Sequence, residues 1–124
     1  MADANTIVTN FVKLFDAEKP DAAAIGAFFT EDALYHNIPM DPVQGRQAIE
    51  KLLGGMGATM LSKGWEVTHQ VAAGNVVMNE RIDRFQMGEK AVSIPVMGVF
   101  VVKGDKIAEW RDYFDLAMFQ KQMQ

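Results

Sequence analysis

Hydrophobic residues recur three and four positions apart through most of the first half of the chain, which is the period of an amphipathic helix. Pro20 ends the first such run, and Asp21 is suited to cap the next one, because its side chain can accept a hydrogen bond from a free backbone N–H. The pattern predicts helices over Asn5–Glu18, Asp21–Phe29 and Arg46–Leu53, and a strand over Ala33–Ile38.

The period changes to two in the second half, which indicates strands separated by glycine-containing turns. Trp65, Val67, His69 and Val71 are expected to share one face of the first of these strands, and Pro95 is expected to interrupt the third. The pattern predicts strands over Trp65–Ala73, Val76–Gln86, Ala91–Val102 and Lys106–Asp115, and a closing helix over Leu116–Gln124.

Helices followed by an antiparallel meander predict an α+β fold, in which helices cover one side of a curved, mostly antiparallel sheet. The 124 residues suffice for one core and leave no room for a second. We therefore expect a single domain over residues 1–124.

Composition narrows the classes of function. A hydrophobic content of 49% and a charged content of 23% are typical of a globular chain, and the net charge of −4 argues against nucleic acid as a partner. The sequence shows neither a signal peptide nor an apolar run of about 20 residues that would span a membrane. The expectation is a cytoplasmic protein that binds neither nucleic acid nor membrane.

Methionine and phenylalanine are frequent, with nine and eight copies. These residues either fill the core or form an adaptable wall around an apolar ligand. Both interpretations stay open from composition alone.

Three predicted strands carry polar side chains and large apolar ones on the same face, since residues two apart on a strand point the same way. The shared faces are Tyr35 with Asn37; Val77, Asn79, Arg81, Asp83 and Phe85; and Trp110, Asp112 and Phe114.

The charged residues on these faces allow two interpretations. Alternating charge on a strand is most often a solvated face, and an exposed Arg81–Asp83 pair would stabilise the fold by less than ~1 kcal/mol. The aromatic neighbours favour burial, because large rings are rarely left on a wet face. If Arg81, Asp83 and Asp112 are buried together, two like charges share one cation and one carboxylate is pushed toward keeping its proton. Such a pair of carboxyl groups is typical of acid–base catalysis.

Other chemistry finds less support in the sequence. The two histidines, His36 and His69, lack the spacing of metal ligands, so no metal site is predicted. The chain has no cysteine, no glycine-rich phosphate loop and no serine in a nucleophile elbow.

The motifs around the charged residues resemble the limonene-1,2-epoxide hydrolase family. The matching segments are "LYHNIPM" with "GRQAIE" close behind, "NERIDRF", and "VMGVFVVKGDKIAEWRDYFDL", together with the amphipathic N-terminal helix. The resemblance runs from about Ile7 to Phe119. It implies a cone of sheet and helices around a deep apolar pocket, a fold shared with ketosteroid isomerases and polyketide cyclases, and it implies a homodimer without a cofactor.

The resemblance also assigns roles to the polar residues. Asp112 would be the base, Asp83 the acid and Arg81 the bridge between them, while Tyr35 and Asn37 would help Asp112 hold the attacking water. The expected partners are water and a small apolar epoxide, cyclic or lipid-like, which would be converted to a vicinal diol in one acid–base step. The expected substrate-binding residues are Phe85, Trp110, Phe114 and Val77.

The sequence departs from the family pattern at His36, where glutamine is common, and matches it loosely after Pro39 and over Leu53–Lys63. These two segments are expected to shape the pocket. Two alternatives remain: a ketosteroid-isomerase-like or cyclase enzyme, and a non-catalytic module that binds an apolar ligand on the same fold.

Overall fold

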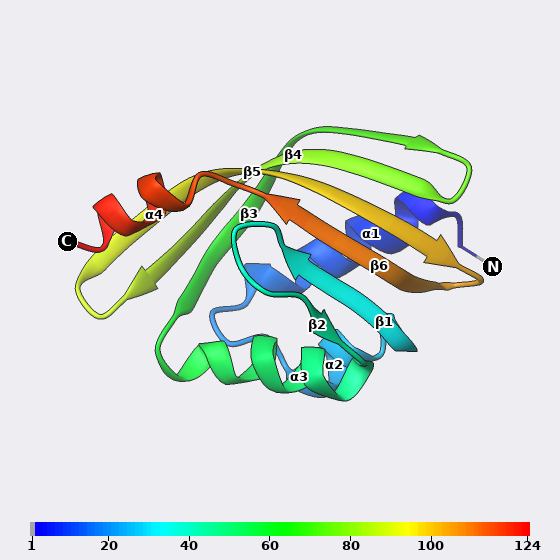
Figure 1. Ribbon diagram of the computed structural model, residues 1–124, viewed down its shortest axis with the longest axis horizontal. Helices are drawn as coiled ribbons and strands as arrows, with labels where there is room; N and C mark the ends of the chain where they lie inside the picture. Colours follow the sequence, from blue (N-terminus) through cyan, green and yellow to red (C-terminus); the bar gives the residue numbers. More distant parts are fainter. Residues whose placement is uncertain (1) are drawn as a thin grey trace.

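The computed structural model describes residues 2–124, which form helices and a single six-stranded sheet (Figure 1). The helical elements are α1 (Ala4–Lys13), η1 (Leu14–Asp16), α2 (Ala22–Gly26), α3 (Arg46–Gly55), η2 (Met56–Ala58) and α4 (Leu116–Gln122). The strands are β1 (Phe29–Asn37), β2 (Val43–Gln44), β3 (Leu61–Ala73), β4 (Val76–Met87), β5 (Lys90–Lys103) and β6 (Lys106–Tyr113).

The sheet is open, with strand order β2-β1-β6-β5-β4-β3. Strands β1 and β6 run parallel, and every other neighbouring pair is antiparallel. The helices α1, α2 and α3 cover one face of the sheet, which we call the inner face (Figure 1). Helix α4 lies beside the beginning of β5, where Gln122 pairs with the backbone of Ser93. The predicted α+β class with a mostly antiparallel sheet is confirmed.

Strand β2 and the position of Pro95 differ from the predictions, and β1 begins at Phe29, the last residue of an expected helix. The two-residue strand β2 was not predicted, because two residues are too few to show a period. Pro95 lies within β5 and does not interrupt it. Because β6 pairs with β5 only from Met97 onward, residues 90–96 have a strand neighbour on one side only, and proline is tolerated at such an edge.

A bulge in β3 changes the direction of its side chains. Trp65 and Val67 pair with inner-face residues of β4, whereas His69 and Val71 pair with residues that point to the outer face. The expected common face of these four residues is therefore wrong, because the register shifts between Val67 and His69 and one extra residue reverses the alternation. As a consequence, Gln70 points to the inner face.

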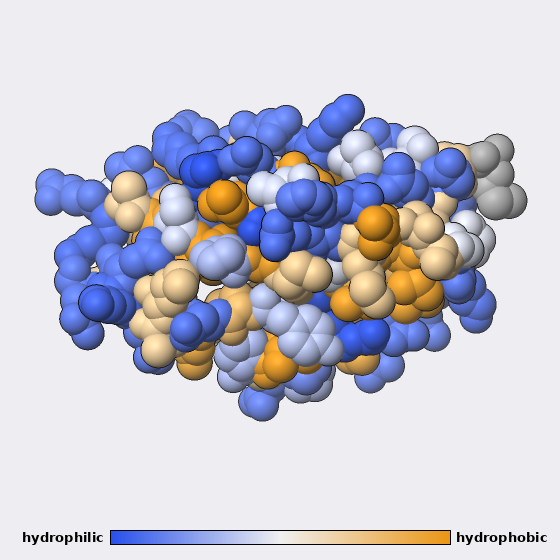
Figure 2. Space-filling model, turned by 90° about the horizontal axis from the view of Figure 1, so that it is seen from above, coloured by the Kyte–Doolittle hydropathy of each residue, from blue (hydrophilic) through white to orange (hydrophobic). Residues whose placement is uncertain are grey.

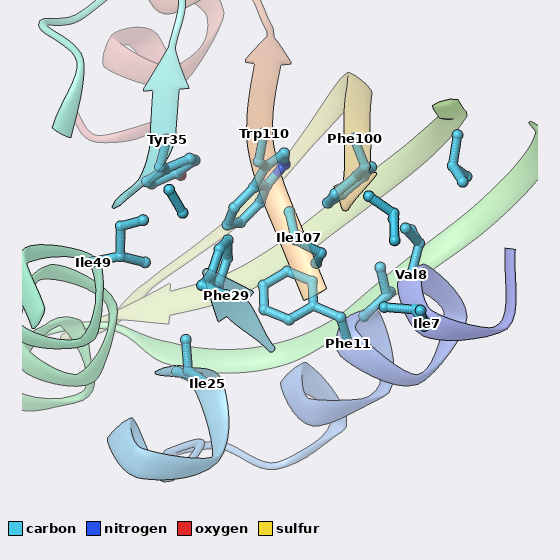
Figure 3. Close-up of a cluster of buried hydrophobic side chains, with 14 of the residues drawn as sticks. Ile7, Val8, Phe11, Ile25, Phe29, Tyr35, Ile49, Phe100, Ile107 and Trp110 are labelled. Carbon is cyan, nitrogen blue, oxygen red and sulfur yellow. The ribbon is translucent and has the colours of Figure 1, made fainter. Parts of the chain in front are cut away.

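The main core lies between α1 and the inner face. Asp3 caps α1 by accepting a hydrogen bond from the backbone N–H of Thr6 at 2.8 Å, and the apolar side of the helix is buried. Phe11 has no exposed surface and meets five aromatic rings edge-on, including Trp110 at 5.0 Å and Phe29 at 5.3 Å between ring centres (Figure 3). This cluster holds α1 against the sheet.

The outer face of the sheet carries exposed apolar side chains between polar ones. Its exposed large hydrophobic residues are Val71, Met78, Met97 and Tyr113. Figure 2 shows the molecule from above, turned by 90° from Figure 1, and on this surface apolar groups are separated by hydrophilic ones. No helix among residues 2–124 is long and apolar enough to cross a membrane.

We expect Phe11→Ala to lower the free energy of unfolding by about 3–5 kcal/mol, because it leaves a cavity at the centre of the aromatic cluster. Leu52→Ala is the control, since this leucine of α3 is 41% exposed and its truncation should change stability by less than about 0.5 kcal/mol. Urea unfolding of both variants checks the difference. Equal effects would contradict this placement of the core.

Candidate active site

Arg81 lies at the centre of a buried charged cluster on the inner face. Its guanidinium has no exposed surface and donates to Asp83 through Nε at 3.0 Å and Nη2 at 2.9 Å. The same group donates to Asp112 through Nη2 at 2.8 Å and Nη1 at 3.2 Å. The strand alternation therefore placed these three residues together correctly, and the cation bridges both carboxylates.

All five N–H groups of this guanidinium have an acceptor. Four go to the two carboxylates, and the remaining one, on Nη1, goes to Oδ1 of Asn79 at 3.1 Å. Burial by itself would lower the pKa of Arg81, but Asp112 and Asp83 raise it above its ordinary value. The cluster thus contains a permanent positive charge.

The two carboxylates have different surroundings. Asp112 accepts a third N–H bond from Nε1 of Trp110 at 2.7 Å, in addition to the two from Arg81. Burial raises the pKa of Asp83, and Arg81 offsets only part of that effect. Three N–H donors suit a carboxylate that carries its charge, and a raised pKa suits one that keeps its proton.

Tyr35 and Asn37 reach the cluster from β1. The parallel pairing of β1 with β6 sets Tyr35 beside Trp110 and Asn37 beside Asp112, and the ring of Tyr35 stacks on that of Trp110 at 4.1 Å (Figure 3). Burial raises the pKa of the Tyr35 hydroxyl, and the negative charge of Asp112 raises it further, so this hydroxyl keeps its proton.

Gly98 provides the space in which the cluster crosses the sheet. It lies on β5 between Asn79 of β4 and Asp112 of β6. A Cβ atom at this position would stand 2.5 Å from Nη1 of Arg81 and 2.9 Å from Oδ1 of Asp112. Because β5 separates the two strands, Arg81 can reach Asp112 only where β5 lacks a side chain.

A cavity of about 130 Å³ opens above the cluster. Tyr35, Asn37, Asp83 and Asp112 line it, whereas Arg81 lies behind them. Of the remaining lining residues, Glu18 and Ser62 are polar and the others apolar. The apolar ones are Phe15, Pro20, Met40, Leu53, Met56, Met60, Trp65, Phe85, Ile94, Val96, Phe114 and Phe119.

The residues predicted to contact substrate fall into two groups. Phe85 and Phe114 line the cavity, but Trp110 and Val77 do not. Both of the latter point to the inner face as predicted, yet neither has any exposed surface, because both are packed in the main core with Phe11 of α1. Alternation along a strand indicates the face but not which part of that face a helix covers.

Segments outside the predicted strand faces supply much of the wall. Met40, Leu53, Met56 and Met60 line the cavity, which agrees with the expectation that the loop after Pro39 and the segment Leu53–Lys63 shape it.

Trp65 was assigned no role from the sequence. Its indole lines the cavity and faces the guanidinium of Arg81, with 4.8 Å from Cζ to the ring centre.

The arrangement brings two carboxyl groups, a phenol hydroxyl and an amide to the wall of an apolar cavity. Asp112 with Tyr35 and Asn37 can hold a water molecule, and Asp83 can donate to an oxygen atom on the same wall. Among residues 2–124, no cluster of three or more His, Asp or Glu side chains could hold a metal ion.

Known proteins resemble this chain in sequence and in fold. Epoxide hydrolase EphG of Mycobacterium tuberculosis (strain ATCC 25618 / H37Rv) is 33% identical over 101 residues, which cover 80% of this chain and 66% of that protein, just under two thirds of its length. The structure of an M. tuberculosis LEH-like epoxide hydrolase superimposes with a TM-score of 0.81 at 29% identity, covering 96% of this chain and 87% of the other.

A putative polyketide cyclase from Xanthomonas campestris pv. campestris superimposes with a TM-score of 0.82 at 19% identity, covering 98% of this chain and 96% of that one, and this likeness shows the fold alone. The family model described as the limonene-1,2-epoxide hydrolase catalytic domain matches residues 2–124. The chain belongs to the limonene-1,2-epoxide hydrolase family and carries its catalytic domain over the whole of the described range.

Proposed function

We propose that this protein hydrolyses an apolar epoxide to a vicinal diol in one acid–base step, without a cofactor. The observation that carries the proposal is the buried cluster in which one guanidinium binds two carboxylates beneath an apolar cavity. The family of this chain and its similarity to known epoxide hydrolases support the same reaction.

The base in this proposal is Asp112. A water molecule held by Asp112, Tyr35 and Asn37 gives a proton to the Asp112 carboxylate while its oxygen forms a bond to an epoxide carbon. The Arg81 and Trp110 donors hold this carboxylate in place.

The acid is Asp83, which donates its proton to the epoxide oxygen as the carbon–oxygen bond breaks. The raised pKa of Asp83 keeps that proton available at higher pH than for an exposed carboxyl group. A neighbouring positive charge in an apolar site also stabilises the negative charge that develops on the oxygen. After one turnover Asp112 carries the proton and Asp83 the charge, and exchange with water restores the first state.

The substrate is proposed to present its epoxide on a small apolar ring or chain. The cavity of about 130 Å³ is close to the ~150 Å³ of an engineered apolar cavity that binds benzene. Methionine side chains from η2 and the segment after it form part of the wall, and these adapt to irregular ligand shapes.

The alternatives from the sequence differ in what they require. An isomerase or cyclase would need a base and a donor for an enolate oxygen, but it would have no use for water held by Asn37. A ligand-binding module would need only the apolar wall. Incubation with a panel of epoxides and cyclic ketones, with products identified by mass spectrometry, separates the three.

The homodimer stays a prediction. The exposed apolar residues of the outer sheet face provide a surface on which a second copy could pack. The cytoplasmic location likewise stays a prediction.

We expect Asp112→Asn and Asp83→Asn each to lower turnover of a cyclic epoxide by ~10² or more, because each removes one proton-transfer group. The fold should persist, but the free energy of unfolding should fall by about 1–3 kcal/mol, because an amide accepts only at Oδ1 and leaves one Arg81 N–H donor unpaired. Asp105→Asn, in the exposed turn between β5 and β6, is the matched control for turnover. Diol formation and urea unfolding are the measurements, and either site variant with turnover like that of the control would contradict the two-carboxylate scheme.

Tyr35→Phe should lower turnover by about tenfold, the effect of losing one hydrogen bond of ~1–1.5 kcal/mol to the reacting water. The fold should persist, because the phenylalanine ring can keep the stacking on Trp110. Tyr113→Phe changes the only other tyrosine, which is 44% exposed on the outer face. Equal turnover in the two variants would remove Tyr35 from the mechanism.

A further inference from the structure

Asn79 completes the hydrogen bonding of the Arg81 guanidinium, although it does not line the cavity. Its side chain is 1% exposed on β4, two residues before Arg81, and its Oδ1 accepts the N–H of Nη1 that neither carboxylate takes. Without this acceptor the guanidinium would have one buried donor unpaired, and buried donors are nearly always paired.

The cation fixes the direction of a chain of hydrogen bonds that reaches α1. Arginine can only donate, so Asn79 must present its carbonyl oxygen to Arg81 and its Nδ2 to the next residue, Gln70. Gln70 accepts this bond on Oε1 at 3.1 Å and must therefore present its own Nε2 outward. That group donates to Oδ1 of Asn5 at 2.7 Å and to Oγ1 of Thr9 at 3.0 Å.

Two features of the backbone hold this row of hydrogen-bonded side chains in place. The bulge of β3 turns Gln70 to the inner face, where it pairs in register with Asn79. Gly98 lies on the other side, and a Cβ atom there would stand 2.9 Å from Oδ1 of Asn79. The amide therefore lies in close contact with β5 and is constrained by β3.

We propose that Asn79, supported by Gln70, is a positioning residue of this enzyme: it holds the Arg81 guanidinium in the one orientation that bridges Asp83 and Asp112. This inference rests on the proposed acid–base reaction for its kinetic consequences. Without the Asn79 acceptor, the freed N–H of Nη1 can pair only with Asp112. The guanidinium then turns toward Asp112 and away from Asp83, the proposed acid.

The first test is Asn79→Leu, which keeps the approximate size of the side chain and removes the acceptor. We expect kcat to fall by about 10- to 100-fold, as for the loss of one hydrogen bond to a charged group. KM should change by no more than about twofold, because Asn79 does not line the substrate cavity. Val102→Ala, a core truncation on β5, is the control for lost stability and should keep kcat.

The direction of the hydrogen bonds between Arg81, Asn79 and Gln70 gives a second test, at Gln70. Gln70→Glu can still accept from Asn79, whereas Gln70→Lys can only donate and forces Asn79 to turn its amide. We expect Gln70→Glu to keep most of kcat. Gln70→Lys should lower kcat by nearly as large a factor as Asn79→Leu. Equal effects of the two substitutions, or a kcat for Asn79→Leu like that of the control, would overturn the proposal.

A titration independent of turnover separates this proposal from the proposed function. Carbon-13 NMR of the carboxyl groups follows Asp83 and Asp112 in the unchanged protein, in Asn79→Leu and in Val102→Ala. We expect the midpoint of Asp83 to rise by about half a pH unit or more in Asn79→Leu alone, because the guanidinium that lowers its pKa turns away. Shifted midpoints in a protein that hydrolyses no epoxide would reject the proposed function and keep the positioning role, whereas unchanged midpoints in Asn79→Leu would reject the positioning role.

Discussion

The bidentate contact of one fully buried guanidinium with two carboxylates is the constraint around which this domain is organised. Removing a charged group from water is expensive, and it is tolerated only where partners satisfy every donor. Arg81 meets that condition with Asp83, Asp112 and Asn79. Because two carboxylates share one cation, burial favours a state in which one of them keeps a proton, and the proposed reaction uses this division as an acid beside a base.

The sheet accommodates this contact at a single position. Arg81 and Asp112 belong to β4 and β6, and β5 runs between them. The absence of a side chain at Gly98 lets the guanidinium pass over β5, and the parallel pairing of β1 with β6 places Tyr35 and Asn37 at the same level. The apolar wall combines residues of the strands with Leu53 of α3, Met56 of η2 and Phe119 of α4.

Regular alternation explains what the sequence could predict. Strands β4 and β6 contain no bulge around the charged residues, so Arg81, Asp83 and Asp112 could be placed on one face from their spacing. The same argument failed for β3, because a bulge depends on one local residue and leaves no periodic signal. The partner of Asn79 was missed for that reason.

The second limit of prediction from the sequence was that it does not show which part of the inner face the helices cover. Trp110 and Val77 have the correct orientation but lie under the aromatic cluster of α1, whereas Phe85 lies beyond it and lines the cavity. Which half of a sheet face a helix covers depends on packing between distant segments, which neither spacing nor propensity records.

The effect of Pro95 also depended on a distant segment. This proline is tolerated within β5 because β6 ends beside it.

In the proposed mechanism the cation fixes Asp112 as a base, so that water and not a carboxylate oxygen attacks the epoxide carbon. A single turnover with enzyme in excess, in oxygen-18 water, tests it most directly. With direct attack by water, we expect the diol of this first turnover to contain the label and the protein to contain none. Unlabelled diol together with oxygen-18 in Asp112 would contradict it, because that pattern requires an ester between Asp112 and the substrate.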